Sequence, residues 1–189
     1  MKRSIILASQ SKRRKDLLES LGFDVTIDIP EVEEIGGGED PAALVEKNAE
    51  LKVEAVQSNY SEGIILGSDT IIWYGGHCVG KPDSKEDAIR ILSDLKGGSH
   101  DVYTGVCLMN AQTGVRRIFH DKTIVTFKPV SEEEIRNYVD KVNTLDKAGA
   151  YAIQEYGEDL VERYEGSYTN IVGLPTEKLE EEYHLIANE

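Results

Sequence analysis

The fold class of this chain is decided by the stretch Ile5-Ile6-Leu7-Ala8-Ser9-Gln10-Ser11-Lys12-Arg13-Arg14-Lys15. Its first four residues are an apolar, strand-like run, and the next three form a small polar turn. Leucines at positions 17, 18 and 21 then follow with helical spacing, up to Gly22. A strand that leads directly into a helix is the opening of an α/β fold.

The same stretch also predicts an anion site. Ser11 is a good N-cap, so free backbone N–H groups and the positive end of the helix dipole face the turn. Four of the 21 cations of the chain, residues 12–15, lie in this first helical turn, where cations are unfavourable. A cluster placed against the dipole indicates a bound anion of the phosphate type, and the alternative is a solvated first turn.

Strand-like and helical segments alternate along the rest of the chain. We predict strands over residues 4–8, 24–28, 64–74, 101–110, 115–128 and 159–164. Helices are predicted from the Asp40-Pro41 N-terminal signal to about residue 58, after capping boxes that start at Ser84 and Ser131, and over residues 176–186. Gly75-Gly76 predicts a hairpin turn. Because the long adjacent strands between 101 and 128 look antiparallel, the fold class is α/β with a mixed sheet.

Length and composition restrict the classes of function. With 189 residues, of which 40% are hydrophobic, we expect one domain over residues 1–189. The formal net charge of −14 argues against a nucleic-acid polymer as partner, but allows a small polyanion in a locally positive cleft. Cys78 and Cys107 lack metal-ligand spacing and read as reduced thiols. Without an apolar run of transmembrane or signal-peptide length, we expect no membrane association and a soluble, cytoplasmic protein.

One carboxylate lies inside an apolar run. Asp69 interrupts the strand-like segment 64–74, directly after Gly67 and Ser68. A buried carboxylate must be paired or hydrogen-bonded, since an unpaired buried charge costs several kcal/mol. Asp69 is therefore a candidate catalytic base or metal ligand, and a structural Asp at a strand break is the alternative. Gly67 and Ser68 suggest a bulge or a close ligand approach there.

Other charged residues give weaker signals. Lys52 continues the helical stripe of Val45, Ala49 and Val56, so it is expected on the core-facing side, where a snorkelling lysine is the alternative. Lys81 follows a short strand in the turn Gly80-Lys81-Pro82. Acidic residues at 31, 33 and 34 could bind Mg²⁺ beside a phosphate site, although a solvated charged face is the more common reading.

These motifs taken together resemble the Maf family of nucleoside triphosphate pyrophosphatases, and the resemblance spans nearly the whole chain. It is carried by residues 7–14 (LASQSKRR), 67–70 (GSDT), 80–82 (GKP), 100–105 (HDVYTG), 146–154 (DKAGAYAIQ) and 166–175 (GSYTNIVGLP). The sequence departs from the family pattern at Lys12, where proline is usual, and at Ala152 and Glu155, where glycine is usual.

The resemblance implies a fold, a reaction and roles for residues. The fold would be the elongated, two-lobed, mixed-sheet architecture shared with inosine-triphosphate pyrophosphatases, with a cleft between the lobes. The reaction would be hydrolysis of a nucleoside triphosphate to the monophosphate and pyrophosphate, with a divalent metal, Mg²⁺ or Mn²⁺. Asp69 would be the general base and, with Glu33, would hold the metal. The triphosphate would be bound by Ser9, Arg13, Arg14, Lys52 and Lys81.

Substrate preference and assembly are also implied by the resemblance. Arg13, Thr70 and Gln154 match the branch that prefers dTTP and UTP, and a glutamine amide can pair with the N3–H and a carbonyl of thymine or uracil. Glu155 adds a negative charge beside that amide. The family also suggests a homodimer.

Two other functions stay open at this level. A phosphotransferase using the same anion site is disfavoured, because the chain lacks the Gly-x-x-x-x-Gly-Lys-Ser/Thr loop. A nucleotide-binding regulator of septum formation, without significant turnover, is the alternative that only an assay separates from an enzyme.

Overall fold

The computed structural model describes residues 3–188. Within this range, one mixed sheet contains the strands β1 (Arg3–Ala8), β2 (Phe23–Ile27), β3 (Ile64–Tyr74), β4 (His77–Val79), β5 (Ser99–Asn110), β6 (Arg116–Phe127) and β7 (Val161–Glu165). The α-helices are α1 (Lys12–Ser20), α2 (Pro41–Val56), α3 (Lys85–Leu95), α4 (Glu132–Lys141), α5 (Gly157–Leu160), α6 (Tyr168–Val172) and α7 (Thr176–Ile186). Short 3₁₀ turns cover Gln57–Asn59 and Ala148–Ala150. No helix in the described range is long and apolar enough to cross a membrane.

The sheet has the strand order β2-β1-β3-β5-β6-β7, and β4 pairs with the far end of β3. The pairs of β1 with β2 and with β3 are parallel, whereas the pairs from β3 onward through β7 are antiparallel. The predicted α/β class with a mixed sheet is therefore confirmed, as is the antiparallel pairing of the long strands between residues 99 and 127.

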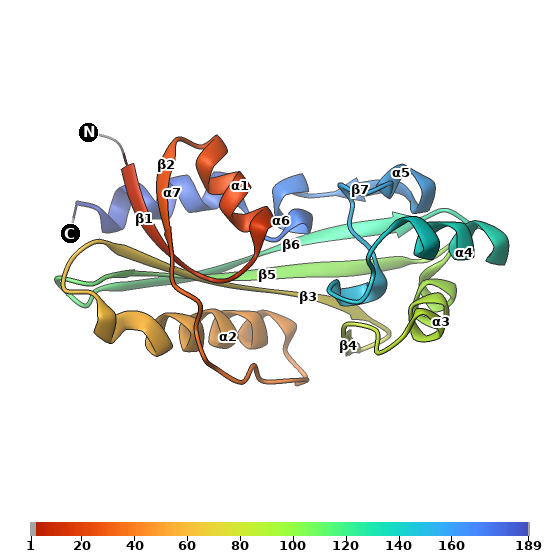
Figure 1. Cartoon of the computed structure of the whole chain (residues 1–189), viewed down its shortest axis with the longest axis horizontal. Helices are drawn as coiled ribbons and strands as arrows, with labels where there is room; N and C mark the ends of the chain where they lie inside the picture. Colours follow the sequence, from red (N-terminus) through yellow and green to blue (C-terminus); the bar gives the residue numbers. More distant parts are fainter. Residues whose placement is uncertain (1–2, 189) are drawn as a thin grey trace.

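The molecule is elongated and has two lobes joined by the long strands β3, β5 and β6 (Figure 1). At one end, α2 lies on one side of these strands, while α1 and α7 lie on the other side. At the opposite end, α3, α4 and α5 surround the other ends of the strands. The predicted elongated, two-lobed architecture is thus the one observed.

Alternation along the strands divides the core of the first lobe between the two faces of the sheet. Leu66 of β3 and Leu108 of β5 belong to a buried cluster with Leu18 of α1. Ile65, the neighbour of Leu66, faces the other way and packs with Val53 of α2. Side chains of successive strand residues point to opposite faces, so this lobe has a helix layer on each side of the sheet.

Two glycines allow α2 to lie directly on the sheet. A Cβ atom at Gly67 of β3 would be 2.2 Å from the carbonyl oxygen of Ala49. At Gly105 of β5 it would be 2.3 Å from the carbonyl carbon of Val45. Gly105 is the register partner of Asp69, so the helix backbone passes close above that carboxylate. The sequence suggested a bulge or a close ligand approach at Gly67, but the pairing of β3 with β5 is regular and the group that approaches is a helix.

Most predicted elements are confirmed, with differences at short or local features. The predicted strand over 159–164 begins two residues too early, because residues 157–160 form the single turn α5. One turn of helix is too short to show a hydrophobic period. The capping box at Ser131 is present, but the one at Ser84 is only half formed. Ser84 accepts from the amide of Asp87, whose carboxylate accepts from the amide of Asp83 rather than that of Ser84.

Candidate active site

A cleft of about 780 Å³ lies where the two lobes meet. Its walls come from the β1–α1 turn, the middle of β3, the β2–α2 connection, and segments 146–155 and 171–173. Every site residue that the sequence predicted, except one, lines this cleft: Ser9, Arg13, Arg14, Lys52, Asp69, Thr70, Lys81 and Gln154. The exception is Glu33, which is exposed and is not part of the lining, so its role as a metal ligand stays a prediction.

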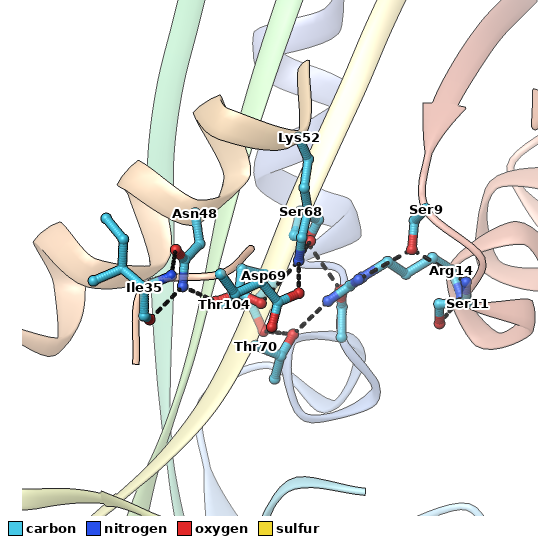
Figure 2. Close-up of polar contacts among 12 residues, drawn as sticks. Ser9, Ser11, Arg14, Ile35, Asn48, Lys52, Ser68, Asp69, Thr70 and Thr104 are labelled. Carbon is cyan, nitrogen blue, oxygen red and sulfur yellow. Dashed lines mark hydrogen bonds and ion pairs between the residues drawn. The ribbon is translucent and has the colours of Figure 1, made fainter. Parts of the chain in front are cut away.

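The carboxylate of Asp69 is held at both oxygens (Figure 2). Lys52 Nζ donates to Oδ1 at 3.0 Å, and Asn48 Nδ2 donates to Oδ2 at 2.9 Å. Burial favours the neutral acid, but the charge of Lys52 and the hydrogen bonds from Asn48 and Lys52 outweigh it and hold the pKa of Asp69 below its usual value. Asp69 is therefore ionised at neutral pH and can accept a proton.

Lys52 joins the carboxylates in this part of the cleft. Its side chain is buried, as the helical stripe predicted, and it does not snorkel to solvent. Besides Asp69, its ammonium contacts the carbonyl oxygen of Ser68 at 3.0 Å and Glu34 Oε1 at 2.7 Å. A buried ammonium requires such partners. Lys52 therefore holds the carboxylates of Glu34 and Asp69 close to each other.

Arg14 connects three segments rather than standing free. Its guanidinium donates to the carbonyl oxygen of Gly173 at 2.9 Å, to Ser9 Oγ at 3.3 Å and to Thr70 Oγ1 at 3.0 Å (Figure 2). Burial lowers the pKa of Arg14, although the guanidinium remains charged. Thr70 Oγ1 lies 3.0 Å from Thr104 Oγ1, and Thr104 donates to the carbonyl oxygen of Asn170, so Thr70 donates to Thr104.

Arg13, Lys81 and Gln154 are predicted site residues of the cleft whose side chains are available to a ligand. In the described part of the chain, none of these three side chains makes a hydrogen bond or an ion pair within the protein. Gln154 is exposed at the cleft, and its neighbour Glu155 does not hold it, because the Glu155 carboxylate pairs with Lys147 Nζ at 3.3 Å. Free cations on one side and an ionised carboxylate on the other suit an anionic ligand that reacts with water.

Sequence reasoning did not select Asn48 and Lys147, which contribute to this site, and it gave Glu34 only as one of three neighbouring acids. Asn48 lies one turn before Lys52 on the same helix face, so its spacing could have identified it. Lys147 is buried in the cleft wall and contacts the carbonyl oxygen of Asn143 at 2.6 Å. Glu34 lies in a connection without regular structure, where no periodicity shows which acid points inward.

The fold and the cleft together define an α/β protein with a cation-bearing cleft between two lobes. Comparison with known proteins gives the family. Residues 4–184 match the model of the Maf-like protein family, so the chain belongs to that family.

Curated relatives match the chain over nearly its whole length. A dTTP/UTP pyrophosphatase of Dictyoglomus thermophilum is 45% identical over 181 residues, covering 95% of this chain and 94% of that protein. A protein of the same name from Desulforamulus reducens is 41% identical, with 94% and 93% covered, and one from Bacillus anthracis is 44% identical, with 94% and 92% covered. Among solved structures, the Staphylococcus aureus Ham1 protein aligns with a TM-score of 0.48 at 17% identity, covering 82% of this chain and 90% of that one.

Proposed function

We propose that this protein hydrolyses nucleoside triphosphates, dTTP and UTP in preference, to the monophosphate and pyrophosphate, and that residues 1–189 act as a single domain. The observation that carries the proposal is Asp69, an ionised and oriented carboxylate in the wall of a cleft that also presents unpaired cations. Full-length relatives that carry the name dTTP/UTP pyrophosphatase support it.

Asp69 would act as the general base. It would take a proton from water as the water oxygen bonds to the α-phosphorus, and the bond from that phosphorus to the bridging oxygen would break, releasing pyrophosphate. A carboxylate has about four lone-pair sites, and Lys52 and Asn48 use two of them in the present arrangement. Acceptor capacity therefore remains for the attacking water.

The cations of the cleft would bind the triphosphate in two different ways. Arg13 and Lys81 are unpaired and would contact phosphate oxygens directly, which stabilises the charge that develops on the leaving pyrophosphate. Arg14 would contribute from a fixed position, since Ser9, Thr70 and Gly173 already hold its guanidinium. Lys52 would add a positive charge beside Asp69, the proposed base.

A divalent cation, Mg²⁺ or Mn²⁺, fits the oxygen ligands at this point of the cleft. The carboxylates of Asp69 and Glu34 both contact Lys52 Nζ, so two hard oxygen ligands lie together beside the proposed phosphate site. Residues 3–188 contain no group of three or more acidic, His or Cys side chains arranged to hold a metal. In this proposal, phosphate oxygens and water would supply the other ligands. We propose Asp69 and Glu34 as ligands, with Glu33 as the sequence-based alternative; the ion would neutralise phosphate charge.

Base preference would come from Gln154. With its oxygen facing the N3–H and its NH₂ group facing a carbonyl, the amide pairs with thymine or uracil. Cytosine, with an N3 acceptor and an amine, would need the amide turned over, so the preference requires that the ligand-bound pocket hold the amide in the first orientation. A mismatched polar edge in a closed pocket costs roughly 1–3 kcal/mol, or about ten- to hundredfold in kcat/KM. Arg13 and Thr70 would act with Gln154, and Thr70 would do so through its hydrogen bond to Arg14.

The net charge and the family resemblance also bear on the substrate, the location and the oligomeric state of the protein. The net charge of −14 disfavours binding of a nucleic-acid polymer, so the substrate would be a free nucleotide of the cytoplasmic pool. A homodimer is proposed from the resemblance to the family.

A panel of common and modified nucleoside triphosphates, each with Mg²⁺ or Mn²⁺, tests the function. We expect pyrophosphate release, fastest from dTTP and UTP. Release of orthophosphate with a diphosphate product would contradict the proposed reaction. Tight binding without turnover would indicate a regulator, and a purine triphosphate as best substrate would contradict the assignment of Gln154.

A further inference from the structure

Asn48 of α2 is a buried amide whose hydrogen-bonding groups are all used. Its side chain is 2% exposed and lies one helical turn before Lys52. Oδ1 accepts from the backbone N–H of Ile35 at 2.8 Å, and Nδ2 donates to the carbonyl oxygen of Ile35 at 3.1 Å and to Asp69 Oδ2 at 2.9 Å. One side chain therefore contacts the backbone of the β2–α2 connection and the carboxylate of Asp69 at once (Figure 2).

These partners permit only one orientation of the amide. If the amide were flipped, its oxygen would face the carbonyl oxygen of Ile35 and the Asp69 carboxylate, and its NH₂ group would face the N–H of Ile35. All three contacts would become repulsive, so the hydrogen-bond network fixes the orientation. In that orientation the donor side of the amide is aimed at Asp69.

The connection that Asn48 holds has few other attachments. Residues 29–39 have no regular secondary structure. Among the described residues, the hydrogen bonds and ion pairs that hold this segment are those of Ile35 with Asn48 and of Glu34 with Lys52. The side chain of Ile35 is 46% exposed, so apolar burial contributes little to its position. Asn48 therefore helps to fix the position of residues 29–39 at the wall of the cleft.

We propose that Asn48 is a positioning residue, whose single amide orients the Asp69 carboxylate and places the β2–α2 connection so that Glu34 and Asp69 meet at Lys52. This inference rests on the proposed function. Lys52 holds Oδ1 and Asn48 holds Oδ2, so rotation of the carboxylate breaks at least one of two hydrogen bonds to a charged group. The lone pairs left for the attacking water then point in a fixed direction.

Two substitutions at Asn48 separate its contacts. Asn48→Ala removes all three hydrogen bonds. Asn48→Asp keeps the size and the acceptor for the N–H of Ile35, but it removes both donors and sets a second carboxylate against Asp69. Asn59→Ala is the matched control, because Asn59 Nδ2 holds the start of the same connection at Asp28 Oδ2 (2.9 Å) without reaching Asp69.

We expect Asn48→Ala to lower kcat for dTTP about 10- to 100-fold, the scale of losing a hydrogen bond to a charged group, with KM changed much less. Asn48→Asp should lower kcat at least as much, although it keeps one contact with the connection. Asn59→Ala should leave kcat within about twofold, as expected for an exposed substitution away from the site. A normal kcat in Asn48→Ala, accompanied only by a lower melting temperature, would show a purely structural role and overturn the proposal.

A double-mutant cycle tests whether Asn48 acts through Asp69. In an Asp69→Asn background the carboxylate is absent, so Asn48→Ala should cost less than about threefold in the residual rate. If the two substitutions multiply, Asn48 acts independently of Asp69 and the proposal is wrong.

Hydrogen exchange without any substrate keeps this inference separate from the proposed function. The Ile35 amide should exchange faster in Asn48→Ala than in the wild type, and Asn48→Asp should retain most of its protection. A wild-type enzyme that releases no pyrophosphate from any triphosphate would refute the proposed function. In that case the exchange result still tests whether Asn48 holds the Ile35 backbone. Unchanged exchange at Ile35 in Asn48→Ala would overturn this part of the inference.

Discussion

Substitution of Gly105 by alanine should disturb both stability and catalysis, because this glycine lets α2 pass over Asp69. The new Cβ atom would lie 2.3 Å from the carbonyl carbon and 2.4 Å from the carbonyl oxygen of Val45, whereas ordinary contacts of a Cβ atom begin at 3.4 Å. The new contact would be about 1 Å shorter than an ordinary contact, and the opposing atoms are helix backbone, which cannot rotate away. The helix must therefore retreat from the sheet.

The expected free-energy cost follows from this overlap. Overpacking of a core costs roughly 1–3 kcal/mol of stability. Replacing glycine lowers the conformational entropy of the unfolded chain, which stabilises the fold by roughly 0.4–1 kcal/mol. Because both contacts are rigid, we expect a net loss of about 2 kcal/mol in the free energy of unfolding. Retreat of α2 also moves Asn48 and Lys52 away from Asp69, and a misplacement of about 1 Å can lower kcat about 100-fold.

Urea denaturation and a pyrophosphate-release assay measure the two effects. Gly36→Ala is the control, since a Cβ atom there meets open space and its φ is not positive, so both quantities should stay near those of the wild type. A Gly105→Ala variant with wild-type stability and wild-type kcat would refute the claim that close packing of α2 sets the geometry around Asp69.

Three further predictions concern individual side chains. Asp69→Asn should lower kcat by about 10²-fold or more with the fold retained, the usual effect of losing a general base, and full activity would place the base elsewhere. Arg13→Ala and Lys81→Ala should each lower kcat/KM by an amount that corresponds to about 2–4 kcal/mol of transition-state stabilisation. Arg90→Ala, at an exposed arginine, should change neither kcat nor KM. Equal effects at all three positions would show that Arg13 and Lys81 act only through the overall charge of the protein. Burial lowers the pKa of His100 from 6.5 to about 4, so the unfolded chain takes up a proton first and stability should fall by roughly 3 kcal/mol as the pH drops from about 6.5 to 4. His100→Asn should remove that slope in denaturation curves measured across this range, and an unchanged slope would show that other groups cause it.

Long and strongly patterned segments were predictable from the sequence. The strand over 64–74 has the predicted bounds, and the predicted start of α2 at Pro41 and span of α7 over 176–186 agree with the structure. The strand ends at a glycine turn and α2 begins at the Asp40 cap, so in these two elements local and tertiary preferences agree. The single-turn α5 and the five-residue α6 carry no such pattern, and they were missed.

The site was predictable as a set of residues but not as a network. The motifs identified the side chains that line the cleft, yet they could not show that Arg14 is held by three protein acceptors while Arg13 is free. They implied Glu33 as the metal-holding acid of the β2–α2 connection, whereas Glu34 is the acid that contacts Lys52, because in an irregular segment the direction of each side chain depends on tertiary contacts such as the one between Asn48 and Ile35. The sequence suggested a bulge or a close ligand approach at Gly67, but its pairing with β5 is regular and the backbone of α2 is what lies against it.

Hydrolysis of dTTP in ¹⁸O-labelled water tests most directly the claim that water activated by Asp69 attacks the α-phosphorus. Mass spectrometry of the products should find the label in dTMP, with unlabelled pyrophosphate. Label in pyrophosphate or in orthophosphate would mean attack at the β- or γ-phosphorus, and it would contradict the account of the site given above.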